Sequence, residues 1–402
     1  MKPMKETLTN PDLLTPVYVF DEDAFIANAN KMTAAFKKYY PNFKLAYSYK
    51  TNYANHICKL ADSLGCFAEV VSPMELQHAL ECGVDVENIV YNGVIRADRQ
   101  KLLVAQLAYG GKVNVDNIDE LIAIDKMAEA RRIKANIGVR LNFDIGNGLV
   151  SRFGIDTEGE DFNKMIAILR ESKYLKLVGV HCHISKAREI EFWKERVRKM
   201  LYYIGKLETA GILDLQYIDL GSNMYAPMEK SLAKQFGDKI PSYRDYAKVI
   251  GKKLRRAFKK NKPLLIVEPG TPLVANTVSV LSTVVGIKEV QGKTFATMDC
   301  SKFNLGAIAG VKNVPIKVFH NSEGMDLVDA DLVGFTCIED DVVNRNYTGK
   351  LAVGDRILFK NVGAYSNTFA PQFIMPVIGM ITAKGEEIKE RDGLLYPFKN
   401  YR

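Results

Sequence analysis

The sequence has no stretch that would cross a membrane, because nowhere do about 18 apolar residues follow one another. The first residues, "MKPMKETLTNPDLLTP", lack the apolar core of a secretory signal. Low-complexity tracts are also absent, and 47% apolar with 25% charged residues is the composition of a globular protein. We therefore expect a folded cytoplasmic protein with no membrane partner.

Paired cysteines and a nucleic-acid motif are missing as well. The six cysteines, at positions 58, 66, 82, 182, 300 and 337, form no C-x-x-C pair, which favours reduced thiols in the cytosol and gives no reason to predict a metal site. The net charge is +8, but the basic segment at 251–260 has helical spacing and is typical of a solvated helix face. No nucleic-acid partner is predicted, and the charge favours anionic small molecules.

A chain of 402 residues suggests two domains. In the first part, short β-rich runs alternate with stretches whose apolar residues recur every three or four positions, several of which end in glycine. This order predicts a (β/α)₈ TIM barrel, with a doubly wound open sheet as the alternative. The eight predicted strands span residues 44–50, 66–71, 88–93, 112–116, 136–142, 177–184, 215–221 and 264–270.

The character of the sequence changes from about residue 273. Segments such as "TVSVLSTVVGIKEV" and "GDRILFKNVG" are separated by turn residues and have almost no helical periodicity, which predicts an all-β domain. We assign the first strand, "TPVYVFD", to this domain because it precedes the first barrel strand. The predicted domains are a barrel at 22–272 and a β domain at 1–21 and 273–402.

Polar residues stand at the carboxyl end of every predicted barrel strand. Because the reacting groups of such barrels gather at that end, we expect them to form one site. Singly, each is compatible with a structural role, and we expect one for Asp116 or Asn92. The set comprises Lys50, Glu69, Ser72, Asn92, Asp116, Arg140, Asn142, His181, His183, Asp219, Gly221, Glu268 and Gly270.

Lys50 and Glu268 are the most informative members of this set. A lysine amine held where water is scarce loses its proton more readily and can form a Schiff base, although a lone lysine is more often a surface residue. A carboxylate such as Glu268 can hold the ring nitrogen of a bound pyridine aldehyde in its protonated state, which turns the ring into an electron sink. Backbone amides near Gly221 and Gly270 are candidates for holding a phosphate.

The sequence resembles one enzyme family over residues 15 to 375. The motifs "TPVYVFD", "YSYKTN", "AEVVSPMEL", "SRFG", "VGVHCHIS", "YIDLGSN", "IVEPG", "GFTCIEDD" and "GAYS" occur in the order found in this family. It comprises the amino-acid decarboxylases of the alanine-racemase fold that depend on pyridoxal 5'-phosphate, including diaminopimelate and ornithine decarboxylases. The resemblance implies a TIM barrel with a C-terminal β domain, a lyase activity, and a small amino acid as substrate.

The resemblance also implies roles for individual residues. Lys50 matches the lysine that binds the cofactor covalently, His183 the residue against the pyridine face, and Glu268 the partner of the ring nitrogen. Gly221, Ser222, Gly270 and Tyr365 match the positions around the phosphate. Cys337, Glu339 and Asp341 lie in the segment that reaches the active site of the neighbouring subunit, which implies a homodimer with shared sites. Cys337 is the family's candidate for returning a proton to the substrate carbon, and a packing thiol is the alternative.

Four departures from the family pattern affect the phosphate site and the substrate. The glycine triplet after the seventh strand is replaced by "GSNM", so Ser222 and Asn223 take the place of two glycines. Thr271 stands where the family has an arginine, and "HISK" at 183–186 replaces histidine, an apolar residue, glycine and serine.

Ile338 replaces the acidic residue that receives the distal ammonium of a diamino substrate. On a strand, the next residue, Glu339, would point the other way. The sequence therefore favours a substrate other than diaminopimelate or ornithine.

Two other functions compete with decarboxylation. A racemase on the same fold needs a weaker electron sink than the one that Glu268 provides. A catalytically silent protein-binding relative is compatible with the lost glycines and arginine, but it would have no reason to keep Lys50, His183, Glu268 and Cys337 together. Decarboxylation is therefore the leading prediction.

Overall fold

Eight parallel strands close into a barrel in chain order. Each strand pairs with the next one along this series, and β10 pairs with β2 to complete the ring. The predicted barrel is thus confirmed, and the open sheet is not what forms. The strands are β2 (Phe43–Ser48), β3 (Phe67–Val70), β4 (Ile89–Tyr91), β5 (Lys112–Val115), β6 (Ala135–Asn142), β8 (Leu175–His181), β9 (Leu213–Asp219) and β10 (Leu264–Val267). A two-residue strand, β7 (Ile155–Asp156), extends the ladder beside β6.

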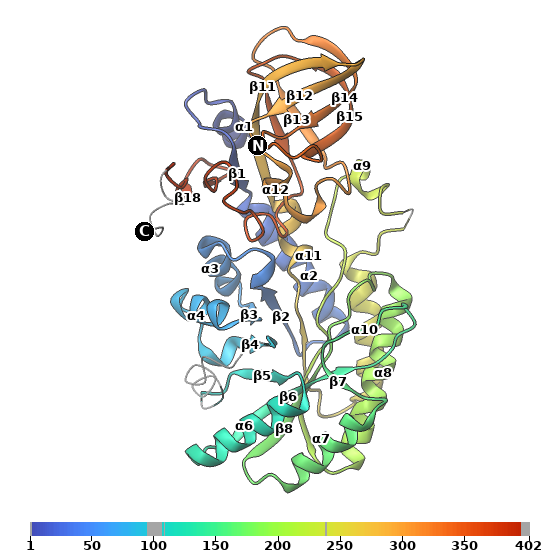
Figure 1. The fold of residues 1–402 in the computed structure, drawn as a ribbon. Helices are drawn as coiled ribbons and strands as arrows, with labels where there is room; N and C mark the ends of the chain where they lie inside the picture. Colours follow the sequence, from blue (N-terminus) through green and yellow to red (C-terminus); the bar gives the residue numbers. More distant parts are fainter. Residues whose placement is uncertain (1, 95–106, 108, 238, 395–402) are drawn as a thin grey trace. The chain divides into compact units, whose positions relative to one another are not determined.

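The computed structural model describes residues 2–94, 107, 109–237 and 239–394 (Figure 1). The chain divides into two units. The barrel unit contains Ala29–Tyr225 and Pro241–Gly270, and the sheet unit contains Met1–Asn28, Ala226–Ile240 and Thr271–Arg402.

Helices alternate with the strands of the barrel unit, as the sequence predicts. The first turn of α4 shows why they begin where they do, because the Ser72 hydroxyl accepts the Glu75 N–H at 3.1 Å and Pro73 occupies the first turn. Glycines with positive φ, Gly83 and Gly211, follow the ends of α4 and α8 within two residues. The helices are α2 (Glu22–Tyr39, beginning in the sheet unit), α3 (Asn55–Ser63), α4 (Pro73–Glu81), α6 (Ile118–Arg131), α7 (Glu160–Glu171), α8 (Ile190–Thr209) and α10 (Tyr243–Ala257), with the 3₁₀ turns η1 (Tyr49–Thr51) and η2 (Val86–Asn88).

A tyrosine fills part of the barrel interior. Tyr217 on β9 belongs to an apolar cluster whose members come from six different barrel strands. Two glycines make room for its ring, since a Cβ at Gly179 would lie 2.0 Å from Cζ of Tyr217 and one at Gly138 would lie 2.2 Å from its hydroxyl oxygen. The Tyr217 hydroxyl donates to Oδ1 of Asn114 at 2.8 Å, which satisfies a polar group that would otherwise be buried unpaired.

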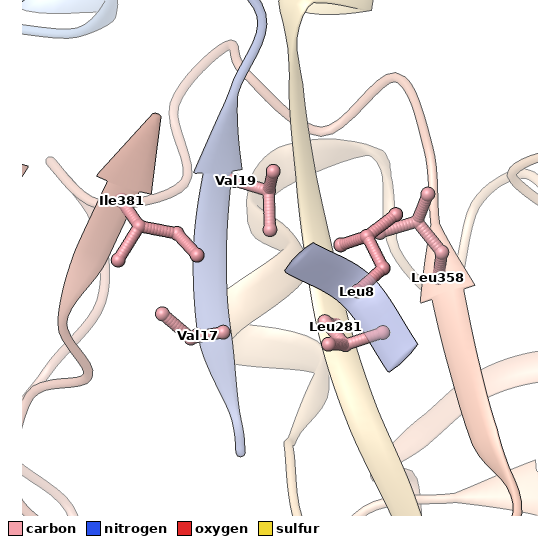
Figure 2. Packing of buried hydrophobic residues seen from close by; sticks show 6 residues of the cluster. All are labelled: Leu8, Val17, Val19, Leu281, Leu358 and Ile381. Carbon is pink, nitrogen blue, oxygen red and sulfur yellow. The ribbon is translucent and has the colours of Figure 1, made fainter. Parts of the chain in front are cut away.

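The sheet unit is built on the long strand β11 (Val278–Val290). The first strand of the chain, β1 (Val17–Phe20), pairs antiparallel with β11 and parallel with β17 (Met380–Thr382), which confirms its predicted place in the β domain. Figure 2 shows the apolar core around these strands, where Val17, Val19 and Leu281 pack with Leu8, Leu358 and Ile381. The other strands are β12 (Lys293–Met298), β13 (Ile316–Phe319), β14 (Met325–Val333), β15 (Val342–Leu351), β16 (Arg356–Phe359) and β18 (Glu387–Lys389).

Short helical segments also occur in the sheet unit, which the strand-only pattern did not predict. They are α1 (Lys2–Thr9), α9 (Lys230–Ala233), α11 (Thr271–Val274) and α12 (Lys302–Leu305), with the 3₁₀ turns η3 (Ala275–Thr277) and η4 (Gly306–Ile308). Three of these helices, α9, α11 and α12, have four residues each, which is too short to give a periodic pattern in a sequence. Across the part of the chain that the structure describes, no helix combines the length and apolar character needed to span a membrane.

Candidate active site

Lys50 lies in η1, directly after β2, as its predicted place at the strand end requires. Its amine forms an ion pair with the Glu69 carboxylate of β3 and donates to Oγ of Ser48 at 2.8 Å. The Ser48 hydroxyl donates to the same carboxylate. Glu69 is 1% exposed, whereas the Lys50 side chain is 32% exposed. A buried anion therefore holds the amine at the edge of the barrel, where a ligand can reach it.

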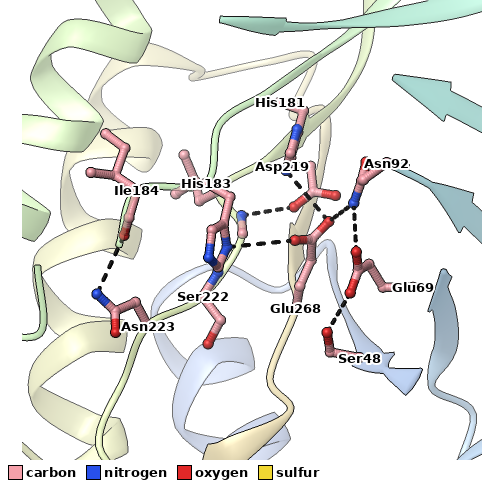
Figure 3. A network of polar contacts seen from close by, with 12 residues as sticks. Ser48, Glu69, Asn92, His181, His183, Ile184, Asp219, Ser222, Asn223 and Glu268 are labelled. Atoms are coloured by element: carbon pink, nitrogen blue, oxygen red, sulfur yellow. Dashed lines mark hydrogen bonds and ion pairs between the residues drawn. The ribbon is translucent and has the colours of Figure 1, made fainter. Parts of the chain in front are cut away.

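A hydrogen-bond chain connects this anion with Glu268, which follows β10 (Figure 3). Nδ2 of Asn92 donates to Oε1 of Glu69 at 3.2 Å and also to the Glu268 carboxylate. Asn114 donates to Oδ1 of Asn92 at 2.8 Å. Lys50 and Glu268 thus belong to one polar network at the carboxyl ends of the strands. Asn92 joins the two acids, a role that the sequence did not reveal.

Glu268 lies in a buried group with His181 and Asp219. Nε2 of His181 is 3.6 Å from Oε1 of Glu268, and each of the three residues is at most 3% exposed. Burial and the neighbouring Glu268 charge raise the pKa of Asp219 well above its usual value, so Asp219 keeps its proton. Burial also opposes ionisation of Glu268, but His181 and Asp219 outweigh it and hold the pKa of Glu268 below its usual range. The group therefore presents one ionised carboxylate, that of Glu268.

Burial lowers the pKa of both histidines of "HCH". Burial lowers the pKa of His181, although Glu268 acts in the opposite direction. Burial and the Lys50 charge lower the pKa of His183 well below its usual value. Nδ1 of His183 lies 4.0 Å from Oε2 of Glu268 and accepts the N–H of Ser222 at 3.2 Å, which makes Nδ1 the nitrogen without a proton. His183 is therefore a flat, uncharged ring beside the ionised Glu268.

Two glycines and a serine line the same end of the barrel. A Cβ at Gly221, where φ is +59°, would lie 2.7 Å from the carbonyl oxygen of Cys182. One at Gly270 would lie 1.9 Å from Oγ1 of Thr51. Only glycine fits either position. Ser222 is 4% exposed and its hydroxyl has no hydrogen-bond partner among the described residues. A buried hydroxyl with no partner is a suitable donor for an anion such as a phosphate.

The remaining strand-end residues have mainly structural contacts. Asp116 accepts the N–H of Gly154 at 3.0 Å, and its carboxylate lies 3.8 Å from the guanidinium of Arg140. Ser72 caps α4. Asn142 donates to the carbonyl oxygen of Ser151 at 2.8 Å.

The other predicted site residues belong to the sheet unit. Cys337 and Glu339 are exposed. Asp341 is 2% exposed and accepts hydrogen bonds from the N–H of Lys302 at 2.7 Å and from the hydroxyl of Thr336 at 2.6 Å. The segment from Ile338 to Asp340 lies outside the strands, between β14 and β15, so the strand alternation expected for Ile338 and Glu339 does not apply there. Tyr365 has φ +57° and its ring centre lies 5.3 Å from that of Phe369.

The groups in the barrel unit fit the cofactor that the sequence predicts. Pyridoxal phosphate binds to a lysine amine, a partner for its ring nitrogen, a flat neighbour for its ring and donors for its phosphate. Lys50, Glu268, His183 and the Gly221–Ser222 segment supply these in one network. The carboxylate of Glu268 distinguishes this site from that of a racemase, in which an arginine is expected near the ring nitrogen.

Comparison with known proteins agrees with this chemistry. Residues 26–275 match the model of the pyridoxal-dependent decarboxylase family, pyridoxal binding domain. The chain is 31% identical over 379 residues to diaminopimelate decarboxylase of Methanocaldococcus jannaschii, covering 89% of this chain and 84% of the relative. It is also similar to that enzyme's crystal structure with L-lysine, with a TM-score of 0.86, 28% identity and coverage of 96% and 92%. Diaminopimelate decarboxylase from Helicobacter pylori complexed with L-lysine gives a TM-score of 0.80, 26% identity and 96% coverage of both chains.

Proposed function

Because this chain belongs to the pyridoxal-dependent decarboxylases, we propose that its substrate is a small amino acid whose distal end carries no amino group. The family makes the protein a lyase that uses pyridoxal phosphate to remove the carboxylate of an amino acid. Ile338 carries the proposal about the substrate. It is 36% exposed and follows Cys337 at the position where the resemblance implies an acid for a distal ammonium. An isoleucine gives an ammonium no charged partner.

Bound pyridoxal phosphate would supply the electron sink for the electrons left behind when CO₂ departs. We assign Lys50 to covalent binding of the cofactor, with Glu69 keeping its amine in place through the ion pair. We assign the ionised Glu268 to the ring nitrogen and the neutral His183 to the ring face. Because Glu268 is charged, it favours a protonated ring and thus decarboxylation over racemisation.

The phosphate is assigned to Gly221, Ser222 and Gly270, with Tyr365 as a further donor. The unpartnered Ser222 hydroxyl and the lack of space for a side chain at both glycines support this assignment. For Tyr365, support comes from the "GAYS" motif and from its left-handed backbone.

We propose that the protein is a head-to-tail homodimer in which Cys337 serves the partner's active site. Cys337 is exposed in the single chain. This is a requirement for a thiol that acts in the active site of another chain. Asp341 shapes its loop by accepting hydrogen bonds from Lys302 and Thr336, and Glu339 is an exposed member of the same loop. Large apolar residues are also exposed in the sheet unit, at Phe369 (62%), Phe373 (38%), Ile374 (57%) and Met375 (43%). An exposed apolar group of this kind is typical of an interface.

We also propose that the protein acts in the cytoplasm. All six cysteines are free, and four of them are buried thiols. Reduced thiols suit a reducing compartment.

The substrate proposal is tested by measuring CO₂ release from a panel of amino acids. The panel includes meso-diaminopimelate, L-lysine and L-ornithine together with amino acids that end in apolar or carboxylate groups. We expect the highest kcat/KM for a member of the second group. The proposal fails if one of the three diamino acids is the best substrate.

A change at Ile338 separates the substrate proposal from the general activity. Ile338→Glu restores an acid beside Cys337 and should raise kcat/KM for diamino substrates by about tenfold, since a charge pair with a bound ligand contributes about 1–3 kcal/mol. Val353→Glu is the matched control, because Val353 is also an exposed apolar residue of the sheet unit and plays no part in the proposal. An equal effect of both variants would rule out a specific role for Ile338.

A further inference from the structure

Arg196 is a fully buried arginine to which neither the sequence motifs nor the assignments above give a role. It lies on α8, is 0% exposed, and its guanidinium carbon is 3.9 Å from the ring centre of Trp193. Nη1 donates to the carbonyl oxygens of Leu220 at 3.0 Å and Ser222 at 2.8 Å. Nη2 donates to the carbonyl oxygen of Ile184 at 2.9 Å. One side chain thus connects the segment after β8 with the segment after β9.

Arg196 forms no ion pair with any of the described residues. By contrast, Arg198, two residues further along the same helix, pairs with Glu195 at 2.5 Å. Burial lowers the pKa of the Arg196 guanidinium to about 10, so it remains a cation at neutral pH. A buried cation that forms no ion pair is costly, and the charge of Glu268 offsets only part of the effect of burial on Arg196. An anionic ligand at the segments that Arg196 holds would offset this cost.

The peptide groups that Arg196 binds turn their amides to the opposite side. In a trans peptide, the carbonyl oxygen and the amide hydrogen point in opposite directions. The Ser222 carbonyl faces Arg196, so the N–H of Asn223 faces away from it, and the same holds for Ile184 and the N–H of Ser185. Asn223 has φ +87°, a left-handed conformation that needs support in a residue other than glycine. The unpartnered, buried hydroxyl of Ser222 belongs to the same segment.

We propose that Arg196 is a positioning residue for the phosphate of the cofactor. It fixes the carbonyls of residues 184 and 222 so that the amides of residues 185 and 223 face the phosphate, and its charge stabilises the phosphate through these peptides. Residues 221–223 and Thr271 contain no cationic side chain. In the segment after β8, Arg188 donates to Oδ1 of Asn223 at 3.3 Å, but Arg196 is the cation that binds the carbonyls of both segments. The proposal rests on the assignment of the phosphate to Gly221 and Ser222 and is independent of the substrate.

The test compares two ligands that differ only in the phosphate. The full-length protein, freed of cofactor, is titrated with pyridoxal 5'-phosphate and with pyridoxal, and binding is followed by visible absorbance without any substrate. Arg196→Met should weaken pyridoxal phosphate binding by at least about tenfold and pyridoxal binding by less than about threefold, since only the former loses a charge partner. Arg196→Lys, which keeps the charge, should lie between the wild type and Arg196→Met.

Arg198→Met is the matched control, because Arg198 is an exposed arginine of the same helix. It should leave both affinities unchanged. Equal weakening of both ligands in Arg196→Met, or no weakening of either, would overturn the proposal. If Arg196→Met does not fold, Arg196→Lys decides: a loss confined to pyridoxal phosphate supports the role, and a loss shared by pyridoxal refutes it. Because no substrate is present, a wrong substrate assignment leaves this result untouched.

Discussion

At the scale of single residues, the site depends on which buried groups carry charge. Four titratable side chains lie together, and burial alone would neutralise all of them. Asp219 and His183 are neutral, whereas Glu268 is ionised because His181, Asp219 and Lys50 stabilise the anion. The sequence predicted Glu268 and His183 as site residues from their place after strands. It could not predict the division of charge, which arises from interactions between residues that lie far apart in the sequence, such as His183 and Lys50.

His181 predicts a loss of stability in mildly acidic solution. Its folded-state pKa is lowered by burial, so below the unfolded value of about 6.5 the unfolded chain binds a proton that the folded chain does not. As the pH falls from about 6.5 towards the lowered pKa, this residue should reduce the free energy of unfolding by up to about 1.4 kcal/mol per pH unit. Above about pH 6.5 it should have no effect.

Urea unfolding of the wild type and of His181→Asn, each at about pH 7.5 and about pH 5.5, measures the pH-dependent contribution of His181 to the free energy of unfolding. The variant should lose less stability on acidification than the wild type. His183 titrates in both proteins, so its contribution cancels in the comparison. Equal losses in the two proteins would show that His181 is protonated in the folded state.

At the scale of elements, the order of strands and helices was predictable because each has its own periodicity. The eight predicted strands agree with β2 to β6 and β8 to β10 in order, with bounds that differ by at most three residues. Contacts across the barrel were not predictable. Arg196 on an amphipathic helix is typical of a solvent-facing residue, yet it is buried and binds three carbonyls. Short helices such as α12 gave no periodic signal either.

Strand packing inside the barrel leads to a prediction for Gly179. A Cβ there would overlap the ring of Tyr217, so Gly179→Ala should reduce the free energy of unfolding by about 1–3 kcal/mol through overpacking. In the double variant with Tyr217→Leu, the loss should be smaller than the sum of the two single losses, because the smaller side chain makes room. Urea unfolding of the four proteins provides this comparison.

Gly205→Ala is the control for the effect of adding a methyl group. Gly205 lies within α8, and a Cβ there would meet no atom within 4 Å. The substitution should stabilise the protein by about 0.5–1 kcal/mol, because alanine favours a helix more than glycine does. If Gly179→Ala were as harmless as Gly205→Ala, the ring of Tyr217 would not occupy the barrel interior as described.

At the scale of the whole molecule, the chain combines a barrel with a sheet unit to which both ends of the described chain contribute strands. The partners of β1 are β11 and β17, which lie more than 250 residues further along the chain. No local sequence pattern reveals such a pairing, so the first strand could be assigned only from its place before the barrel. The predicted boundaries at residues 22 and 272 stay a prediction. Oligomeric assembly depends on surfaces and not on periodicity, which is why only the resemblance pointed to a dimer.

The proposed homodimer with shared active sites predicts that two inactive variants restore each other's activity. Lys50→Ala and Cys337→Ala should each abolish most activity, because each removes a group assigned to every site. In a mixed dimer, one site then contains both substitutions and the other contains neither. After random exchange of subunits, about half of the dimers are mixed, so about a quarter of the wild-type activity should return.

Mixing Lys50→Ala with Glu268→Ala is the control: both residues belong to the barrel unit of one chain, so no intact site forms. Recovery in this control, or its absence in the first mixture, would show that Cys337 does not act on the partner's site.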